Sequence, residues 1–308
     1  MDAFKQTEKA VGVEVSQAVM KAVCLDAGGN LINSHHSALD RTKDTAPQLV
    51  NFINELDRKF DGFDRLGVTI PGLIDRDAKR VAYSTHIPEH EDIDFLGELE
   101  KIIKQKILVE NDANAAAYGE FVAGAGRGSR NLFYATLGTG IGGAFIIDGK
   151  LWRGESGFAG EFGYVAINSD GMRLEDVASS ANIIRRTRMR FHRDHTSSLN
   201  EIGEESITIA DVVREANRGD DFAQMMLQRT GMYVGAAIAG VINLLNIEKI
   251  VVGGEIMQAG HFVLDAITRR ARELSFAPSF ASTEIVEGEL GENASAIGVA
   301  LLAKGSNG

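Results

Sequence analysis

Val109-Glu110-Asn111-Asp112-Ala113-Asn114-Ala115-Ala116-Ala117 joins a short apolar strand, predicted over residues 106–110, to an alanine-rich helix predicted over residues 112–122. Asp112 therefore lies where a strand ends and a helix begins. Strand ends of α/β sheets open toward the crevice in which ligands bind, and a helix N-terminus favours an ionised carboxylate. An ionised Asp112 could accept the proton of a hydroxyl that attacks phosphorus. The alternative is that Asp112 only caps the helix, since Asp is an ordinary capping residue.

A glycine loop follows in the run Gly138-Thr139-Gly140-Ile141-Gly142-Gly143. Apolar strands are predicted on both sides of it, over residues 131–137 and 144–147, and Asp148-Gly149 predicts a tight hairpin turn onto residues 150–152. Closely spaced glycines let backbone N–H groups approach a phosphate without interference from Cβ atoms. A tight turn without a ligand is the alternative. A carboxylate and a phosphate loop in one chain together point to phosphoryl transfer.

Composition limits the possible partners and compartment. The 308 residues are 44% hydrophobic, which suffices for two α/β lobes around a cleft. The net charge of -11 argues against nucleic acid or an anionic membrane as a partner. Cys24 is the only cysteine, which fits a reducing compartment, and the N-terminus lacks an apolar secretory segment. The uncharged runs 131–147 and 231–247 are too short to span a bilayer. We therefore expect a cytoplasmic protein.

Periodicity and turn residues give a coarse order of elements. The small lobe is predicted to span residues 1–113, completed by a C-terminal helix over residues 292–308, and a larger lobe spans residues 114–291. The other predicted elements are a strand-and-turn start over residues 11–34, a helix with Pro47 in its first turn, a strand over 66–70 ended by Pro71-Gly72, a helix over 96–104, a glycine-rich loop over 154–163, helices over 209–217 and 222–245, and a strand over 249–254.

Further motifs extend nearly from end to end of the chain. They are Thr69-Ile70-Pro71-Gly72, Gly157-Phe158-Ala159-Gly160-Glu161-Phe162-Gly163, Ala216-Asn217-Arg218-Gly219-Asp220, Ile250-Val251-Val252-Gly253-Gly254-Glu255 and Ala294-Ser295-Ala296-Ile297-Gly298-Val299-Ala300. In this order and spacing, and with the two stretches above, the chain resembles the ROK family (repressors, open reading frames and sugar kinases) of the actin-like ATPase superfamily.

The resemblance implies a two-lobed actin-like (ribonuclease H-like) α/β fold and a glucokinase-like transfer of phosphate from ATP, with Mg²⁺, to a hexose or N-acetylhexosamine. It makes Asp112 the general base and implies a homodimer. Asn111, Glu161 and Glu175 would bind sugar hydroxyls, although an acid in a glycine-rich loop such as Glu161 is more often simply solvated. ATP phosphates would lie on Gly138, Thr139, Gly140, Gly142 and Gly143, and the adenosine would lie beside Gly253 and Gly254.

Three positions depart from the family pattern. The first phosphate loop, Asp-x-Gly-Gly-Thr in the family, is Glu14-Val15-Ser16-Gln17-Ala18 here, so its backbone approaches a phosphate less freely. The family's zinc-binding His is Tyr164 and its cysteine-rich loop is missing, so we expect no structural zinc. Tyr164 either reaches the sugar through its hydroxyl or is a buried phenol that fills space. The family's sugar-binding Asn is His86, which leaves the identity of the sugar open.

Two functions remain from different classes. One is a sugar kinase, which the intact base and second loop favour; the other is a sugar-binding or regulatory protein with a degraded ATP site. The family's repressors carry an N-terminal winged-helix domain for which residues 1–10 leave no room, so no nucleic-acid partner is expected. A basic cluster is assigned to a solvated helix face or subunit edge, and the methionine-rich run 225–234 to the core; the cluster is Arg185, Arg186, Arg188, Arg190, His192, Arg193 and His195.

Overall fold

The protein was analysed as a computed structural model, which describes residues 8–75, 80–83, 99, 103, 107–190 and 196–305. The chain divides into two compact units. Unit 1 comprises Met1–Ala123, Leu151–Ala159 and Glu292–Gly308, and unit 2 comprises Gly124–Lys150 and Gly160–Gly291. The segment Leu151–Ala159 thus belongs to unit 1 although both of its neighbours in the chain belong to unit 2. The sequence-based division at residue 113 places both this segment and residues 114–123 in the larger lobe, whereas both belong to unit 1.

Unit 1 is built on a five-stranded mixed sheet. Its elements are β1 (Ala10–Val15), β2 (Val19–Leu25), β3 (Leu31–Ala38), α1 (Thr45–Lys59), β4 (Arg65–Ile70), β7 (Ile107–Asn111), α3 (Asp112–Ala123), β10 (Lys150–Trp152) at the boundary with unit 2, and α10 (Ala294–Gly305), with a small hairpin of β5 (Leu73–Asp75) and β6 (Arg80–Tyr83). The sheet order is β3-β2-β1-β4-β7, in which β1, β4 and β7 run parallel and β2 and β3 are antiparallel. The parallel strands all end at the edge where α3 begins.

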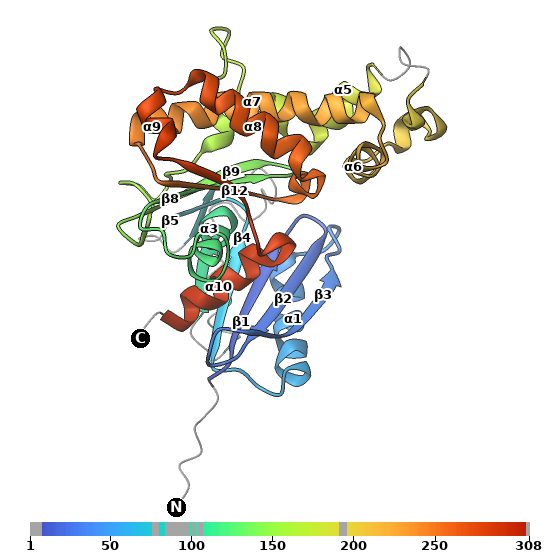
Figure 1. The fold of residues 1–308 in the computed structure, drawn as a ribbon. Helices are drawn as coiled ribbons and strands as arrows, with labels where there is room; N and C mark the ends of the chain where they lie inside the picture. Colours follow the sequence, from blue (N-terminus) through green and yellow to red (C-terminus); the bar gives the residue numbers. More distant parts are fainter. Residues whose placement is uncertain are drawn as a thin grey trace, which may run out of the picture. The chain divides into compact units, whose positions relative to one another are not determined.

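The two faces of this sheet have different chemistry. One face carries valine, leucine and isoleucine from the parallel strands and packs on the apolar side of α1. The other face carries Gly12 and Gly67, over which α10 passes very closely (Figure 1). A Cβ on Gly12 would lie 2.9 Å from the carbonyl carbon of Ala296. Because only glycine allows this approach, the position of α10 is fixed by backbone contact.

Helix α10 also packs against α3 through small residues. A Cβ on Gly298 would lie 2.5 Å from the carbonyl carbon of Ala115, and one on Gly119 would lie 2.7 Å from the carbonyl oxygen of Ala294. Figure 1 shows the two helices crossing in contact. This close packing sets the position of α3, whose first residue is Asp112.

Unit 2 has a second five-stranded sheet, covered on one face by helices. The sheet consists of β8 (Leu132–Leu137), β9 (Ile141–Ile147), β11 (Lys249–Gly253) and β12 (Glu284–Glu287), with β10 at one edge, in the order β10-β9-β8-β11-β12. The helices are α4 (Glu175–Ala178), α5 (Ser180–Arg188), α6 (Ile209–Asn217), α7 (Asp221–Leu245), α8 (His261–Leu274) and α9 (Ala277–Ala281), with short turns η2 (Phe162–Tyr164), η4 (Ser198–Glu201), η5 (Glu204–Ser206), η6 (Glu255–Ala259) and η7 (Gly291–Asn293), the last at the edge of unit 2.

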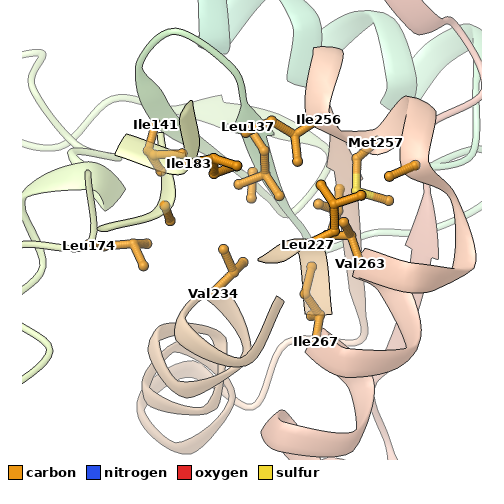
Figure 2. Packing of buried hydrophobic residues seen from close by; sticks show 14 of the residues in the cluster. Leu137, Ile141, Leu174, Ile183, Leu227, Val234, Ile256, Met257, Val263 and Ile267 are labelled. Carbon is orange, nitrogen blue, oxygen red and sulfur yellow. The ribbon is translucent and has the colours of Figure 1, made fainter. Parts of the chain in front are cut away.

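The core of unit 2 lies between this sheet and α7 and α8. Figure 2 shows Leu137 and Ile141, which flank the glycine loop, among buried residues of the helices that include Val234 and Val263. The ends of the loop are therefore anchored in the core.

Most predicted elements are confirmed where the structure describes them. Helix α3, strand β7 and the hairpin turn at Asp148 (φ 53) and Gly149 (φ 73) are present as expected. The glycine loop is shorter than predicted, because Gly142 and Gly143 already belong to β9. The predicted helix over residues 96–104 falls almost wholly outside the described residues. In the methionine run, Met225 and Met232 are exposed, so their assignment to the core was wrong.

Candidate active site

Asp112 lies at the corner between β7 and α3. Strand β7 ends at Asn111, and α3 begins at the next residue. The Asp112 carboxylate accepts a hydrogen bond from the Ala113 N–H at 2.9 Å and is partly accessible. The Asn111 side chain donates to the Gly72 carbonyl at 3.0 Å and accepts from the Asn114 N–H at 3.0 Å. The orientation of both predicted site residues in unit 1 is therefore set by local hydrogen bonds.

A buried carboxylate supports this corner from beneath. Glu110 is 2% exposed, and its Oε1 accepts from the Asn111 N–H and from Asn114 Nδ2, both at 3.1 Å. Its Oε2 accepts from Arg153 Nη2 at 2.6 Å and Nε at 3.1 Å. Four donors and a guanidinium charge offset the cost of burying this carboxylate.

A second carboxylate stands near Asp112 at the end of β1. Strand register places Glu14 beside Thr69, and Thr69 beside Glu110, so the three residues form one row across the sheet. Glu14 Oε2 is buried without a hydrogen-bond partner. Burial, and secondly the negative charge of Asp112, raise the pKa of Glu14 to about 7. The Asp112 corner is thus faced by a carboxyl that can be neutral at physiological pH.

Two buried oxygen atoms without a partner belong to the described part of unit 1, and both lie around Asp112. One is Glu14 Oε2 and the other is Oδ1 of Asn114, which follows Asp112 by one helical half-turn and is 5% exposed. Buried polar atoms are rarely left unpaired, and such exceptions commonly mark a site that takes a ligand or water. This pattern supports a functional rather than a purely capping role for the corner.

The first loop, residues 14–18, forms a tight turn between β1 and β2. The Ser16 N–H and Oγ both donate to the Val19 carbonyl, at 3.0 and 2.8 Å, and Ser16 Oγ accepts from the Val19 N–H at 3.2 Å. Two of the backbone N–H groups in this turn are therefore already paired. Where the family has glycines and a threonine, this chain has a turn whose hydrogen bonds are made between its own residues, Ser16 and Val19.

In unit 2, Gly138 of the glycine loop would accept a Cβ with only ordinary van der Waals contacts. A Cβ on Gly138 would meet no atom closer than 3.6 Å, although its main chain is held by a hydrogen bond from the Ser180 N–H at 2.8 Å. Ser180 Oγ in turn donates to Glu255 Oε1 at 2.6 Å. The Gly138 N–H already donates to the Gly140 carbonyl at 3.0 Å, so a phosphate bound at this loop would lie against exposed Thr139.

Three other glycines that were predicted to contact ATP, Gly143, Gly253 and Gly254, are explained by close packing. A Cβ on Gly143 would lie 2.9 Å from the Phe133 ring, and one on Gly253 would lie 3.0 Å from the ring of Tyr134. Gly254 has φ +96, and its Cβ would lie 2.6 Å from the Leu137 nitrogen. The fold alone therefore requires glycine at these three positions.

The predicted sugar ligands of unit 2 lie on two neighbouring segments. Glu175 Oε2 accepts from the Ile141 N–H at 2.8 Å, so it ties the start of α4 to the glycine loop. Glu161 is exposed and precedes the turn η2. Tyr164 is 48% exposed and lies beneath the guanidinium of Arg173, 4.7 Å from the ring centre. The alternative of a buried, space-filling phenol was therefore wrong.

Other predicted features are placed as follows. His86 lies outside the described residues. Within the residues that are described, no three His, Cys, Asp or Glu side chains are grouped so as to hold a metal ion, and no helix is long and apolar enough to cross a membrane. Of the basic cluster, His192, Arg193 and His195 lie outside the described residues. Arg186 is not simply solvated, because burial and the charges of neighbouring arginines lower its pKa to about 10, and its Nη2 donates to Thr230 Oγ1 at 2.8 Å.

Comparison with known proteins defines the class. The model of the ROK family matches residues 10–306. A glucokinase of Halalkalibacterium halodurans is 30% identical over 96% of this chain and 94% of its own length, and a xylose repressor of Bacillus spizizenii is 28% identical over 96% of this chain and 77% of its own. A Streptomyces griseus ROK glucokinase, solved with glucose and AMPPNP, covers 97% of this chain and 100% of its own with a TM-score of 0.84 and 27% identity.

These findings establish an α/β protein of the actin-like ATPase fold. The chain belongs to the ROK family. Its relatives include both sugar kinases and transcriptional repressors.

Several residues around the corner were not anticipated as site residues. Glu110 and Asn114 lie inside the stretch 109–117, so the sequence indicated that they are close to Asp112. It did not indicate the hydrogen bonds that they form. Glu14 was noted only as a lost phosphate-loop residue. Arg153 carried no sequence signal, since its partner lies 43 residues earlier.

Proposed function

We propose that this protein is an ATP-dependent kinase that phosphorylates a hydroxyl of a hexose or N-acetylhexosamine, with Asp112 as general base. The observation that carries the proposal is the corner itself, where a partly accessible carboxylate at a helix N-terminus adjoins the buried hydrogen-bond network of Glu110, Asn111 and Asn114. Glucokinase relatives that span nearly the whole chain add support. Asp112 takes the proton of the sugar hydroxyl as the hydroxyl oxygen attacks the γ-phosphorus of ATP, the bond from that phosphorus to the β–γ bridging oxygen breaks, and ADP leaves; general-base catalysis of this kind typically contributes about 10²- to 10⁴-fold in rate.

The remaining roles follow the same proposal. Asn111, Glu161, Glu175, Tyr164 and His86 are proposed to bind sugar hydroxyls. Gly138, Thr139 and Gly140 would hold the nucleotide phosphates, with Gly142, Gly143, Gly253 and Gly254 shaping the surrounding backbone. Bound Mg²⁺ would neutralise charge on the phosphates. We further propose a cytoplasmic homodimer without structural zinc.

The test is Mg²⁺-ATP-dependent transfer of phosphate to a panel of hexoses and N-acetylhexosamines, detected as sugar phosphate. Wild-type protein is expected to turn over at least one sugar, and Asp112→Asn is expected to lose that activity while retaining its melting temperature. Transfer by the Asn variant at the wild-type rate would remove Asp112 from the chemistry.

The second candidate is a sugar-binding or regulatory protein without efficient phosphoryl transfer. The glycine-free turn over residues 14–18 and the repressor relatives favour it. In this case ATP would leave the melting temperature unchanged, whereas a cognate sugar at 100 times its Kd would still stabilise the fold by about 2.7 kcal/mol. Thermal melts with each ligand therefore separate the two candidates.

A further inference from the structure

Arg153 is held against the corner of unit 1 by an ion pair that spans distant parts of the chain. It lies just after β10 in the segment Leu151–Ala159, the stretch that belongs to unit 1 between two parts of unit 2. Its side chain is 26% exposed, and that of Glu110 is 2% exposed. The Nη2···Oε2 distance of 2.6 Å is that of a charge-assisted hydrogen bond.

From Glu110 the hydrogen bonds continue to Asn111, the proposed sugar ligand that directly precedes the base Asp112. The other carboxylate oxygen accepts from the main-chain N–H of Asn111 and from the side chain of Asn114. Asn114 donates its own main-chain N–H to the side-chain oxygen of Asn111. A continuous path therefore runs from the guanidinium of Arg153 to the residue before Asp112.

Loss of the guanidinium would change this path in a specific way. Glu110 would stay buried but lose the guanidinium that pairs with it among the described residues, and breaking a buried ion pair in this way is strongly unfavourable. The carboxylate would then turn toward water or toward other donors, and its bonds to Asn111 and Asn114 would be lost or lengthened. Lysine would restore the charge as a compact point donor, without the planar fork that contacts Glu110 through two nitrogens.

We propose that Arg153 is a positioning residue of the active site, which acts through Glu110 to fix the orientation of Asn111 and Asp112. This inference rests on the proposed sugar-kinase function. It goes beyond a stabilising ion pair, because it assigns to Arg153 an effect on sugar affinity and turnover in protein that is fully folded.

The experiment compares wild type with Arg153→Met, Arg153→Lys and the control Arg65→Met. Arg65 also forms an ion pair in unit 1, with Glu8 at 2.9 Å, but that pair is on the surface. Sugar Kd is measured by calorimetry and kcat by sugar-phosphate formation, both well below the lowest melting temperature. Arg153→Met is expected to lower kcat about 100-fold and to raise the sugar Kd about tenfold, since small misplacements of reacting groups have effects of this size. Arg153→Lys is expected to be intermediate, and Arg65→Met to match wild type.

Each outcome decides the inference. A folded Arg153→Met protein with kcat and sugar Kd within about threefold of wild type would show that the pair only stabilises the fold, as would an equal loss in Arg65→Met. If Arg153→Met does not fold, Arg153→Lys is used in its place. A sugar Kd of Arg153→Lys within about threefold of wild type would then refute the positioning role of Arg153. Wild type that binds sugar without transferring phosphate would refute the proposed kinase but leave the Kd comparison valid. Wild type that neither binds nor phosphorylates any sugar would refute both.

Discussion

Replacement of Gly298 by alanine should destabilise unit 1 by forcing α10 away from α3. The added Cβ would lie 2.5 Å from the carbonyl carbon of Ala115 and 3.0 Å from the nitrogen of Gly119, whereas carbon atoms normally approach to about 3.5–4.0 Å. Both neighbours are backbone atoms, so no side chain can rotate to relieve the overlap. Overpacking of this kind costs about 1–3 kcal/mol, and the upper end applies to backbone clashes. Alanine regains about 1 kcal/mol of helix propensity, so the net loss should be about 2 kcal/mol.

A matched control is available in unit 2. Gly240 lies within α7 and a Cβ there would meet nothing within 4 Å, so Gly240→Ala should gain about 1 kcal/mol from helix propensity alone. Urea denaturation followed by circular dichroism should therefore separate the two variants by about 3 kcal/mol. A Gly298→Ala protein as stable as Gly240→Ala would contradict the close packing of α10 on α3, and with it the account of what positions Asp112.

Three further predictions address the site and its surroundings. Because the pKa of Glu14 is raised from 4.5 to about 7, its stabilising contribution is complete below about pH 4.5 and is lost as the pH rises through 7. Glu14→Gln should therefore be more stable than wild type at pH 8, by at most about 3 kcal/mol, and equal to it near pH 4.5; thermal melts across this range that show no pH-dependent difference would contradict the assignment. Gly138→Ala should leave the melting temperature unchanged, because its Cβ meets nothing closer than 3.6 Å, yet weaken ATP binding about tenfold by adding a Cβ beside the proposed phosphate site; calorimetry that shows unchanged ATP affinity would remove the loop from the nucleotide site. Thr208→Ala should cost about 1 kcal/mol in urea titrations, since Thr208 and Asp211 form a capping box at the start of α6, and a loss below about 0.3 kcal/mol would indicate that the box contributes little.

The sequence was sufficient for elements whose signals are local. The short apolar run before Asn111, followed by an alanine-rich run, predicted the strand, the helix and the corner between them. The Asp148-Gly149 pair predicted its turn because few residues accept positive φ at two successive positions. These features depend on residues close together in the chain.

The role of each glycine could not be predicted from the sequence. A glycine that makes room for a ligand and a glycine that makes room for a neighbouring strand look the same in the sequence. A Cβ on Gly138 would make only ordinary contacts, whereas one on Gly253 or Gly254 would clash with β8, yet all three were assigned to the nucleotide. The ion pair between Arg153 and Glu110 forms because the segment Leu151–Ala159 packs in unit 1. No pattern in the nearby sequence predicts that packing.

The change at residue 14 affects the two candidate functions differently. Below about pH 7 Glu14 holds a proton, because its buried carboxyl lies near Asp112 and lacks a hydrogen-bond partner for one oxygen. Asp112 then faces a neutral neighbour, and its role as a base is not opposed by a second ionised carboxylate. The missing glycines of residues 14–18 act on a different step, since they limit only how closely the backbone approaches a nucleotide phosphate. A weak nucleotide site with an intact base should therefore raise the KM for ATP more than it lowers kcat, whereas loss of the base would lower kcat at any ATP concentration.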